Sequence, residues 1–306
     1  MNIAVTSPSF SKSNVLRAEI LKYFDRVKFN DKDSIHSEED LIQFIDGCEG
    51  VVIGLHQITQ NVLTRSKYLK MIAKYGVGLD NIPADLCEQH SVQVGWTGGV
   101  NRQSVAEQTL SLIIALTRNL YVGSNLLKQG QWVKDGGRQL SELTVGVVGF
   151  GFVGQLLSQY LKPFGCRILV NDIINCDEQA EKSGVICTSF ETLIEQSDVV
   201  SLHVNLNSMS NRFINKAVFE KMKKTAYLIN TSRGQIVDQA ALKYALLNGN
   251  IAGAALDVYE EEPPKDREFL SLPNLICTPH IAGNAQAAVE AMGMSAINHL
   301  KRLIGS

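Results

Sequence analysis

Three glycines close a short apolar run near the middle of the chain. Gly149, Gly151 and Gly154 follow TVGVV (144–148) with the spacing G-x-G-x-x-G, and VGQLLSQYL after them has the pattern of a helix. In a strand–turn–helix unit the first glycine permits a tight turn, the second lets a pyrophosphate approach the backbone, and the third lets the helix pack on the strand. The feature predicts a parallel α/β domain that binds a dinucleotide, with an ordinary glycine turn as the alternative.

The strand expected after the glycines ends in an acidic residue. RILVND (167–172) places Asp172 about twenty residues beyond the turn, where a carboxylate accepts hydrogen bonds from both ribose hydroxyls and repels a 2′-phosphate. Ile173 and Ile174 follow and offer no cation for such a phosphate. We therefore expect NAD as the cofactor and not NADP.

Short apolar runs alternate with helical patterns on both sides of this turn, which is typical of parallel sheets covered by helices. A chain of 306 residues exceeds the usual size of one domain, so we expect two. The predicted strands lie within residues 2–7, 50–55, 69–76 and 92–97 of the first part, and 143–151, 167–172, 198–204, 226–232, 251–258 and 274–280 of the second.

Helices are predicted between these strands. Residues 13–24 and 37–47 have helical spacing, and Ser37 with Asp40 forms a capping pair at the start of the latter. Residues 101–121 form the longest helical pattern, and it is apolar around most of its circumference. We expect that helix to be buried on more than one side.

Composition excludes several classes of partner. The net charge of −2 gives no field that would recruit nucleic acid or an anionic membrane. The first ten residues lack the pattern of a secretory signal, and no apolar run reaches membrane-spanning length, so we expect a cytoplasmic protein. The six cysteines form no C-x-x-C pair and the six histidines no H-x-x-x-H pair, so we expect free thiols and no metal site.

Three charged side chains at the ends of later strands could act on a substrate. Arg233 follows one strand and could hold a carboxylate and polarise the neighbouring carbonyl. His280 ends another and could carry a proton near neutral pH, aided by a glutamate of the run 260–262. Taken singly, each could instead be a surface ion pair, a solvated loop charge or a capping histidine.

At this point the sequence resembles the D-2-hydroxyacid dehydrogenase family, and within it the phosphoglycerate-dehydrogenase-like branch. The segments that carry the resemblance are KYGVGLDNIP, NRQSVAEQTLSLIIALTR, VGVVGFGFVG, LINTSRGQIVDQAAL, AGAALDVYEEEPP and TPHIAG, in the family's order. The resemblance implies two Rossmann-like or flavodoxin-like domains with a cleft between them. It implies an outer, substrate-binding domain of residues 1–100 plus 284–306 and an NAD-binding domain of residues 101–283.

The resemblance also assigns roles. It implies that Arg233 binds the substrate, that Glu262 pairs with the catalytic His280, and that His280 is the acid in reduction or the base in oxidation. It implies cofactor contacts from Gly149, Gly151, Phe152, Val153, Gly154, Asp172, Val204, Thr231, Ser232 and Asp257, the last to the nicotinamide carboxamide. Substrate carboxylate contacts are implied for the backbone of Gly76, Val77 and Gly78. It further implies a homodimer joined through helix 101–121.

One departure from the family bears on the substrate. Members that oxidise 3-phosphoglycerate often carry an Arg-Ser pair after the strand GVVI, whereas this chain has Gly54 and Leu55 there. Lys74, Arg102 or Arg138 could supply the missing cation, or each could be an ordinary surface charge. The expected reaction is hydride transfer between NAD and C2 of a D-2-hydroxy acid or its 2-oxo acid.

The substrate itself stays open at this level. 3-Phosphoglycerate is the first candidate, and glyoxylate, hydroxypyruvate or another pathway-specific hydroxy acid are the alternatives. A protein that senses NAD, like a corepressor, is the non-enzymatic alternative. The presence of Arg233, Glu262 and His280 together argues against it, because a pure sensor need not keep all three.

Overall fold

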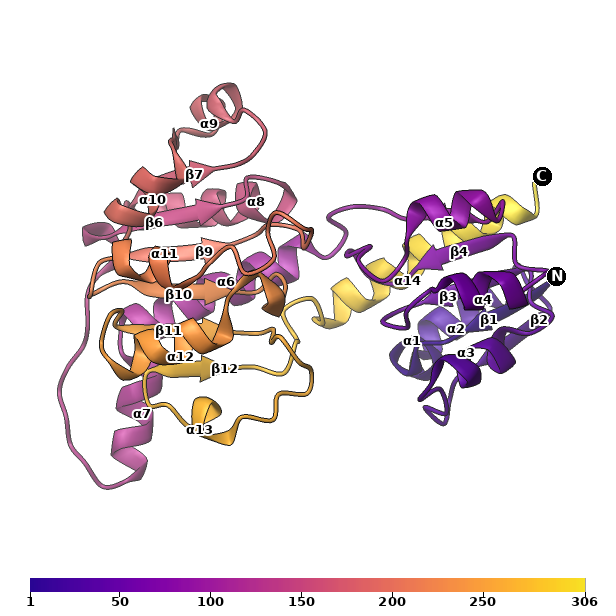
Figure 1. Ribbon diagram of the computed structural model, residues 1–306, viewed down its shortest axis with the longest axis horizontal. Coiled ribbons are helices and arrows are strands. Elements are labelled where there is room, and N and C mark those ends of the chain that lie inside the picture. The colour runs from indigo at the N-terminus through magenta and orange to yellow at the C-terminus, as the bar shows by residue number, and fades with distance from the viewer. Residues whose placement is uncertain (306) are drawn as a thin grey trace. The chain divides into compact units, whose positions relative to one another are not determined.

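The computed structural model describes residues 1–305, and Figure 1 shows its two compact units. One unit consists of Met1–Asn101 and the residues from Asn284 onward, and the other of Arg102–Gly283. Each unit is built on one sheet in which all strands run parallel. The α/β class with two parallel-sheet domains, predicted from the sequence, is confirmed.

The first unit has a five-stranded sheet in the order β2-β1-β3-β4-β5, which is the flavodoxin-like order. Helices α3, α4 and α5 pack against one face, and α1, α2 and α14 against the other. The strands are β1 (Asn2–Val5), β2 (Arg26–Phe29), β3 (Gly50–Ile53), β4 (Met71–Lys74) and β5 (Gln93–Gly95). The helices are α1 (Pro8–Lys12), α2 (Asn14–Ile20), α3 (Glu38–Ile45), α4 (Gln60–Arg65), α5 (Ala84–Gln89) and α14 (Gln286–Leu300), followed by the short η4 (Lys301–Leu303).

The second unit has a seven-stranded sheet in the order β12-β11-β10-β9-β6-β7-β8. Its strands are β6 (Thr144–Val148), β7 (Arg167–Asn171), β8 (Ile186–Cys187), β9 (Val199–Leu202), β10 (Tyr227–Asn230), β11 (Gly253–Leu256) and β12 (Leu275–Cys277). Strand order reverses between the neighbours β6 and β9, as in a Rossmann fold. Ligands bind to such sheets at the carboxyl ends of the strands beside this reversal.

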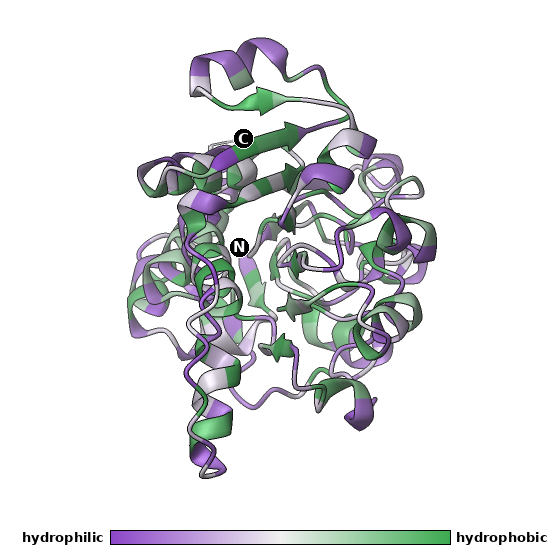
Figure 2. Ribbon diagram, turned by 90° about the vertical axis from the view of Figure 1, so that its left-hand side faces the viewer, coloured by the Kyte–Doolittle hydropathy of each residue, from purple (hydrophilic) through white to green (hydrophobic). Residues whose placement is uncertain are grey.

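Helices cover both faces of the second sheet. Helices α6 and α8 share one hydrophobic core, and α10, α11, α12 and α13 share the other. The helices of this unit are α6 (Arg102–Thr117), α7 (Leu120–Lys128), α8 (Phe152–Leu161), α9 (Asp177–Ser183), α10 (Phe190–Gln196), α11 (Lys216–Lys221), α12 (Gln239–Leu247) and α13 (Arg267–Leu270), with short helical turns η1 (Leu140–Glu142), η2 (Lys162–Phe164) and η3 (Gly234–Ile236). Figure 2 shows the hydrophobic strands between helices whose outer faces are hydrophilic. Each fully buried aliphatic side chain in these cores stabilises the fold by about 1.5–3 kcal/mol.

Two strands were not predicted from the sequence, and both lie at sheet edges. Strand β2 alternates between exposed and half-buried residues, and β8 has only two residues. An edge strand has a neighbour on one side only and is often short, so its residues show a weaker apolar pattern than those of the central strands. The predicted cap of α3 is confirmed, since Ser37 Oγ accepts a hydrogen bond from the backbone N–H of Asp40.

The predicted helix 101–121 is two helices. Helix α6 ends at Thr117, Asn119 adopts a left-handed backbone conformation (φ 51°), and α7 continues at an angle of 61°. A returning loop explains the break, because the backbone N–H of Arg138 donates to Thr117 O. A Cβ on Gly137 would lie 2.1 Å from the same carbonyl oxygen, so only glycine permits this approach. The expected burial holds for α6, whereas no residue of α7 is buried.

The expectation that all six cysteines are free thiols is wrong. Cys176 and Cys187 form a disulfide, while Cys48, Cys87, Cys166 and Cys277 are free. Cys176 immediately precedes α9 and Cys187 lies in β8, and packing of α9 against β8 brings their Cα atoms to 6.1 Å. The spacing of these two cysteines carries no motif, so only the tertiary fold reveals the pair.

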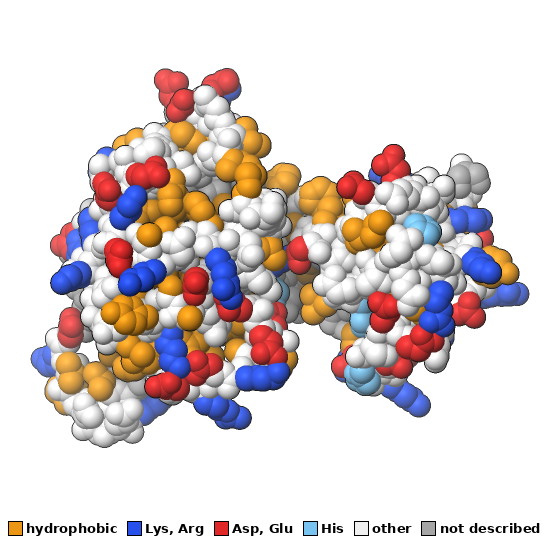
Figure 3. Space-filling view, viewed as in Figure 1, with side chains coloured by type: hydrophobic (Ala, Val, Ile, Leu, Met, Phe, Trp, Pro, Cys, Tyr) orange, Lys and Arg blue, Asp and Glu red, His pale blue; other side chains and the backbone are white. Residues whose placement is uncertain are grey.

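Among the described residues, no single helix is long and apolar enough to cross a membrane. Only α6 and α7 taken together pass that test of length and composition, and they are bent relative to each other. On the face shown in Figure 3, acidic and basic side chains are intermingled over the surface.

Candidate active site

The turn after β6 leaves no room for a side chain at two of its three glycines. Gly149 has φ +94°, and a Cβ there would lie 2.4 Å from His203 O. A Cβ on Gly154 would lie 2.1 Å from Gly149 O, so this glycine allows α8 to pack against the turn. At Gly151 a Cβ would meet nothing within 4 Å, so the surface at the start of α8 is open. This arrangement fits a pyrophosphate on the N-terminus of α8, where backbone N–H groups and the helix dipole attract anions.

Asp172 lies at the end of β7 and is oriented by the same turn. Its Oδ2 accepts a hydrogen bond from Phe150 N at 2.6 Å, and its Oδ1 accepts one from Ile174 N at 3.1 Å. A carboxylate has more acceptor positions than these two bonds use, so it can still accept ribose hydroxyls. Ile173 and Ile174 are exposed beside it, with 86% and 73% of their surface accessible. Phe152 is exposed and Val153 half-buried in the first turn of α8.

The residues expected to line the cofactor site after β9 and β10 are also at the carboxyl edge of the sheet. Val204 packs partly against the core and approaches the Gly149 turn. Ser232 is half-buried, and its hydroxyl donates to Leu202 O at 2.5 Å. Thr231 is only 8% exposed, and its hydroxyl bonds to that of Thr109 on α6 at 3.0 Å. Thr231 therefore joins the strand end to α6 through its side chain.

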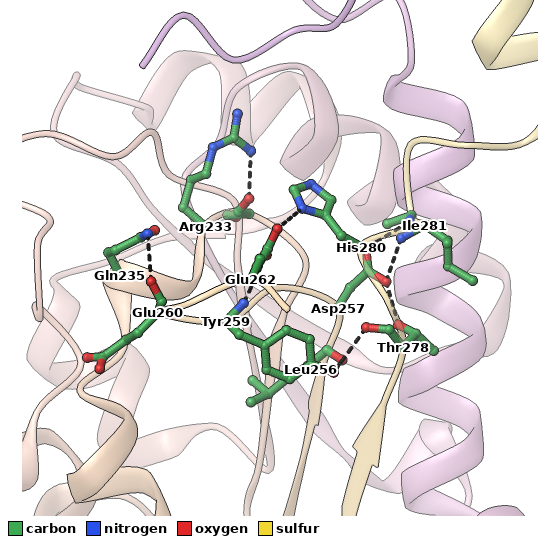
Figure 4. A network of polar contacts seen from close by, with 12 residues as sticks. Arg233, Gln235, Leu256, Asp257, Tyr259, Glu260, Glu262, Thr278, His280 and Ile281 are labelled. Atoms are coloured by element: carbon green, nitrogen blue, oxygen red, sulfur yellow. Dashed lines mark hydrogen bonds and ion pairs between the residues drawn. The ribbon is translucent and has the colours of Figure 1, made fainter. Parts of the chain in front are cut away.

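His280 and Glu262 form an ion pair across the ends of β11 and β12. His280 Nδ1 lies 2.7 Å from Glu262 Oε2, and Figure 4 shows Glu262 between His280 and Arg233. Arg233 is half-buried and its Nη1 donates to Ser232 O at 2.8 Å. The structure thus brings together a guanidinium, a carboxylate and an imidazole that come from three different strand ends.

The three glutamates of residues 260–262 each contact a different partner. Glu262 contacts His280, whereas Glu260 lies 3.4 Å from the Arg212 guanidinium and Glu261 pairs with Lys265. The expectation from the resemblance selected Glu262, and this is the glutamate that the fold turns toward the imidazole.

Electrostatics in the pair favour an ionised Glu262. Burial by itself would raise the pKa of this carboxyl group. The hydrogen bond and charge of His280, the backbone N–H of Tyr259 and the charge of Arg233 outweigh burial, so the pKa of Glu262 is lowered from its ordinary value. An ionised Glu262 fixes the orientation of the imidazole by accepting from Nδ1, which leaves Nε2 as the nitrogen that can exchange a proton with a ligand.

Asp257 is fully buried at the end of β11. Its Oδ1 accepts from Ile281 N at 2.9 Å and its Oδ2 from Ala282 N at 2.7 Å. Gln108 and Thr278, which the sequence reasoning did not select, also donate to Oδ1. The Asp257 carboxylate therefore holds the backbone that follows His280.

His203, which the sequence analysis also did not select, lies next to the glycine turn, with its carbonyl oxygen facing Gly149. Burial lowers its pKa to about 3, so its ring is neutral near pH 7, and its Nε2 lies 2.8 Å from Ser201 Oγ. The signal in the sequence was only that a histidine follows a buried strand, which does not distinguish a packing role from a catalytic one.

In the first unit, the turn Gly76–Gly78 follows β4 and is half-buried. Gly76 has φ +140°, which disfavours any side chain, and Trp96 Nε1 donates to Val77 O at 2.6 Å. Beneath the turn, the buried Lys74 donates through Nζ to Gly54 O at 2.7 Å and to Asn81 Oδ1 at 2.6 Å.

The other two candidate cations are placed differently. Arg138 Nη1 lies 3.0 Å from Asp198 Oδ1, just before β9 and hence at the opposite end of the sheet from the glycine turn. Arg102 is exposed at the start of α6. Among residues 1–305, no three His, Cys, Asp or Glu side chains gather in a way that could hold a metal ion.

Comparison with known proteins agrees with this geometry. The family model described as "D-isomer specific 2-hydroxyacid dehydrogenase, NAD binding domain" matches residues 110–282. Glyoxylate reductase from Thermofilum pendens is 37% identical over 285 residues, which cover 90% of this chain and 84% of that protein. D-3-phosphoglycerate dehydrogenase from Archaeoglobus fulgidus is 37% identical over 262 residues, which cover 84% of this chain and 50% of that protein.

A solved structure extends the likeness to the whole chain. The crystal structure of D-lactate dehydrogenase from Aquifex aeolicus, complexed with NAD and lactic acid, has a TM-score of 0.87 and 27% sequence identity and covers 100% of this chain and 96% of that chain. The fold and the site define a dinucleotide-binding α/β protein of the Rossmann class. The chain belongs to the D-2-hydroxyacid dehydrogenase family, and the unit Arg102–Gly283 contains its NAD-binding domain. It spans half the length of the Archaeoglobus relative.

Proposed function

We propose that this chain is an NAD-dependent dehydrogenase that interconverts a small D-2-hydroxy acid and its 2-oxo acid. The observation that carries the proposal is the His280–Glu262 pair, which lies beside Arg233 at the same edge of the sheet as the glycine turn. A protein that only sensed the dinucleotide would need the turn and Asp172 but not this pair. The unit Arg102–Gly283 is the NAD-binding domain in this proposal, and the other unit is the substrate-binding domain.

The cofactor contacts follow from the chemistry of the edge. Backbone N–H groups at the start of α8, around Phe152 and Val153, would hold the pyrophosphate between the glycines. Asp172 would accept the adenosine ribose hydroxyls, and Ile173 with Ile174 would cover an apolar ring beside it. Val204, Thr231 and Ser232 would line the remaining site, whereas Asp257, which is fully buried, would position the segment after His280.

The reaction divides into proton and hydride movement. NAD, when bound, exchanges the hydride with C2 of the substrate. Arg233 would bind the substrate carboxylate and polarise the carbonyl, because its planar guanidinium donates two parallel hydrogen bonds. His280 would give a proton to the carbonyl oxygen in reduction and remove it from the hydroxyl in oxidation. Glu262 would keep the imidazole oriented and stabilise its protonated form.

The turn in the other unit would add carboxylate binding. Backbone N–H groups of Gly76, Val77 and Gly78 are proposed to donate to the substrate carboxylate. The bond from Trp96 to Val77 O supports this, because it anchors the turn, and the positive φ of Gly76 is a conformation that glycine adopts without strain.

For the substrate, we favour a small unphosphorylated 2-oxo acid over 3-phosphoglycerate. Leu55 follows β3 with 82% of its surface exposed, where an arginine would suit a phosphate. Arg138 is paired at the opposite end of the sheet, and the Lys74 ammonium donates to Gly54 O and Asn81 Oδ1 inside the first unit. The glyoxylate reductase of Thermofilum pendens, with its near-complete overlap, agrees with this preference.

A panel of 2-oxo acids tests the proposal. Purified protein would be mixed with NADH and, in turn, glyoxylate, hydroxypyruvate, pyruvate and phosphohydroxypyruvate, and the loss of reduced-nicotinamide absorbance would be followed. We expect turnover on one or more unphosphorylated acids, abolished by His280→Asn while NADH binding persists. Binding of NADH without turnover of any acid would favour a sensor, and preference for the phosphorylated acid would overturn the substrate assignment.

We further propose a homodimer, but with α7 in the interface. The sequence expectation placed the interface on helix 101–121, yet the buried side chains of α6 pack within their own unit. Leu120, Leu127 and Trp132 are 57%, 56% and 78% exposed on α7 and the loop after it, an apolar surface of the kind that a second copy covers. Sedimentation of the wild type and of Leu127→Asp tests this, because the variant should become monomeric.

A further inference from the structure

One polar side chain joins helix α6 to the segment that carries His280. Gln108 is half-buried, and its Nε2 donates to Asp257 Oδ1 at 3.1 Å and to Thr278 Oγ1 at 3.1 Å. The Thr278 hydroxyl in turn donates to Asp257 Oδ1 at 2.5 Å. The three side chains form a closed hydrogen-bonded ring that connects α6 with the ends of β11 and β12.

The same ring determines the path of the backbone through His280. His280 N donates to Asp257 O at 2.8 Å, and Ile281 N and Ala282 N donate to the Asp257 carboxylate. Figure 4 shows Asp257 between Thr278 and Ile281, with His280 extending from this turn toward Glu262. His280 has φ +53°, a left-handed conformation that non-glycine residues keep only when their surroundings hold it. The hydrogen bonds to Asp257 are what hold it.

We propose that Gln108 is a positioning residue for His280, an inference that rests on the proposed function of that histidine. The amide nitrogen lies within hydrogen-bond distance of both acceptors, and this ties the rotamers of Asp257 and Thr278 to that of Gln108. Without it, the Asp257 carboxylate can turn about its side-chain bonds and release the amides of Ile281 and Ala282. The imidazole then loses its alignment with Glu262 and with the substrate oxygen.

A second contact from α6 supports the same role for the helix. Ser104 Oγ donates to Ala282 O at 2.6 Å, and Ser104 and Gln108 are four residues apart, hence on one face of α6. Through these two side chains the helix contacts both ends of the segment Thr278–Ala282. Thr109 of the same helix bonds instead to Thr231 after β10, so within α6 it is Ser104 and Gln108 that contact the His280 segment.

The test compares Gln108→Leu with Gln103→Leu. Gln103 is an exposed glutamine of the same helix that bonds to Glu107 and contacts nothing at the site, so it controls for the change of residue type. With glyoxylate as the first substrate, we expect Gln108→Leu to lower kcat about 10- to 100-fold, as displacement of a catalytic group does. KM for NADH should change by less than about twofold, because α8 and the glycine turn are untouched. Gln103→Leu should match the wild type.

The threonine of the ring supplies a second, gentler series. Thr278→Ser keeps the hydroxyl and should retain most of the wild-type kcat, whereas Thr278→Val removes the hydroxyl at constant shape and should lower it. If the three side chains act as one unit, Gln108→Leu with Thr278→Val should be no worse than the more severe single variant. This series decides the question if Gln108→Leu fails to fold, and equal kcat for the serine and valine variants would then overturn the proposal.

Hydrogen exchange gives a readout that does not depend on turnover. The backbone amides of Ile281 and Ala282 should exchange faster in Gln108→Leu than in Gln103→Leu, because their acceptor is no longer fixed. If the wild type turns over no 2-oxo acid while these amides respond, the proposed function fails and the anchoring by Gln108 stands. If kcat and exchange in Gln108→Leu equal those of the control, or if only the melting temperature falls, the positioning role is refuted.

Discussion

Replacing Glu262 by glutamine tests the proposed proton-transfer pair most directly. Glutamine has nearly the same shape but removes the negative charge that lies 2.7 Å from His280 Nδ1. Burial opposes ionisation of Glu262, yet the bond and charge of His280 lower the pKa of the carboxyl group overall. The ionised carboxylate also orients the imidazole by accepting a hydrogen bond from Nδ1, and a neutral glutamine amide accepts this bond less strongly. The Glu262→Gln variant should fold, but its hydrogen bond to His280 should be weaker than in the wild type.

The size of the effect follows from the geometry. A hydrogen bond to a charged group contributes about 1.5–3 kcal/mol and a neutral one about 0.5–1.5 kcal/mol, so their difference is about 1–1.5 kcal/mol. The two side chains are 37% and 35% exposed, and solvent screening brings the difference down to about 1 kcal/mol. This corresponds to about a fivefold change in rate, since the bond aligns the imidazole during proton transfer.

The assay is the pH dependence of 2-oxo acid reduction, followed by the absorbance of NADH. Because the bond from Glu262 aligns His280 for proton transfer, kcat/KM of Glu262→Gln should be lower than that of the wild type. Activity near neutral pH should fall about fivefold. Glu261→Gln is the control, because that neighbouring glutamate pairs with Lys265 on the surface. A Glu262→Gln profile that coincides with the control would refute the pairing.

The stability of the fold should also depend on the Glu262–His280 pair, and this contribution should decrease in acid. The folded pKa of Glu262 lies below its unfolded value, so the pair stabilises the fold above about pH 4.3 and loses this effect as the pH falls further. The difference in unfolding free energy between wild type and Glu262→Gln should therefore shrink in acid. A constant difference down to strongly acidic pH would contradict this linkage.

Three further substitutions probe the cofactor edge, and chemical reduction probes the disulfide. Asp172→Ala should weaken NAD binding about tenfold by removing the ribose acceptor and should narrow the preference over NADP, as measured by titration of each nucleotide. Gly154→Ala should lower the free energy of unfolding in urea by about 2 kcal/mol or more, because the new Cβ would meet Gly149 O at 2.1 Å. Gly151→Ala, with open space around it, should leave stability unchanged and weaken dinucleotide binding. The Cys176–Cys187 disulfide joins two residues that are 11 positions apart in the sequence. Its reduction should lower the free energy of unfolding by about 3 kcal/mol, which a thermal melt would show.

Each of these has a result that would count against it. An unchanged ratio of NAD to NADP affinity would remove Asp172 from the ribose site. Equal stability of the two glycine variants would show that packing of α8 does not need Gly154. If dithiothreitol exposes two thiols without moving the melting temperature, the disulfide does not hold α9 and β8 together.

Local sequence alone determined much of this protein. The spacing of the glycines, with a buried strand before and a helix after, is a local pattern, and its backbone requirements can be read without knowing the rest of the fold. The same holds for Asp172, which ends the next strand, and for Ser37, which caps α3 through a residue three positions away. The central strands were predictable because both faces are buried, which leaves continuous apolar runs.

The tertiary structure decided what depends on residues far apart in the sequence. The helix predicted over 101–121 ends at Thr117 because residues 137 and 138 return to it, and β2 and β8 form because a neighbouring strand is there to receive them. The disulfide of Cys176 depends on how α9 packs on β8. Gln108 is 149 residues from Asp257, and no local pattern in the sequence indicates that the two side chains are in contact. Local patterns report short-range backbone preferences and burial, whereas hydrogen bonds between distant side chains exist only once the sheet has brought the strand ends together.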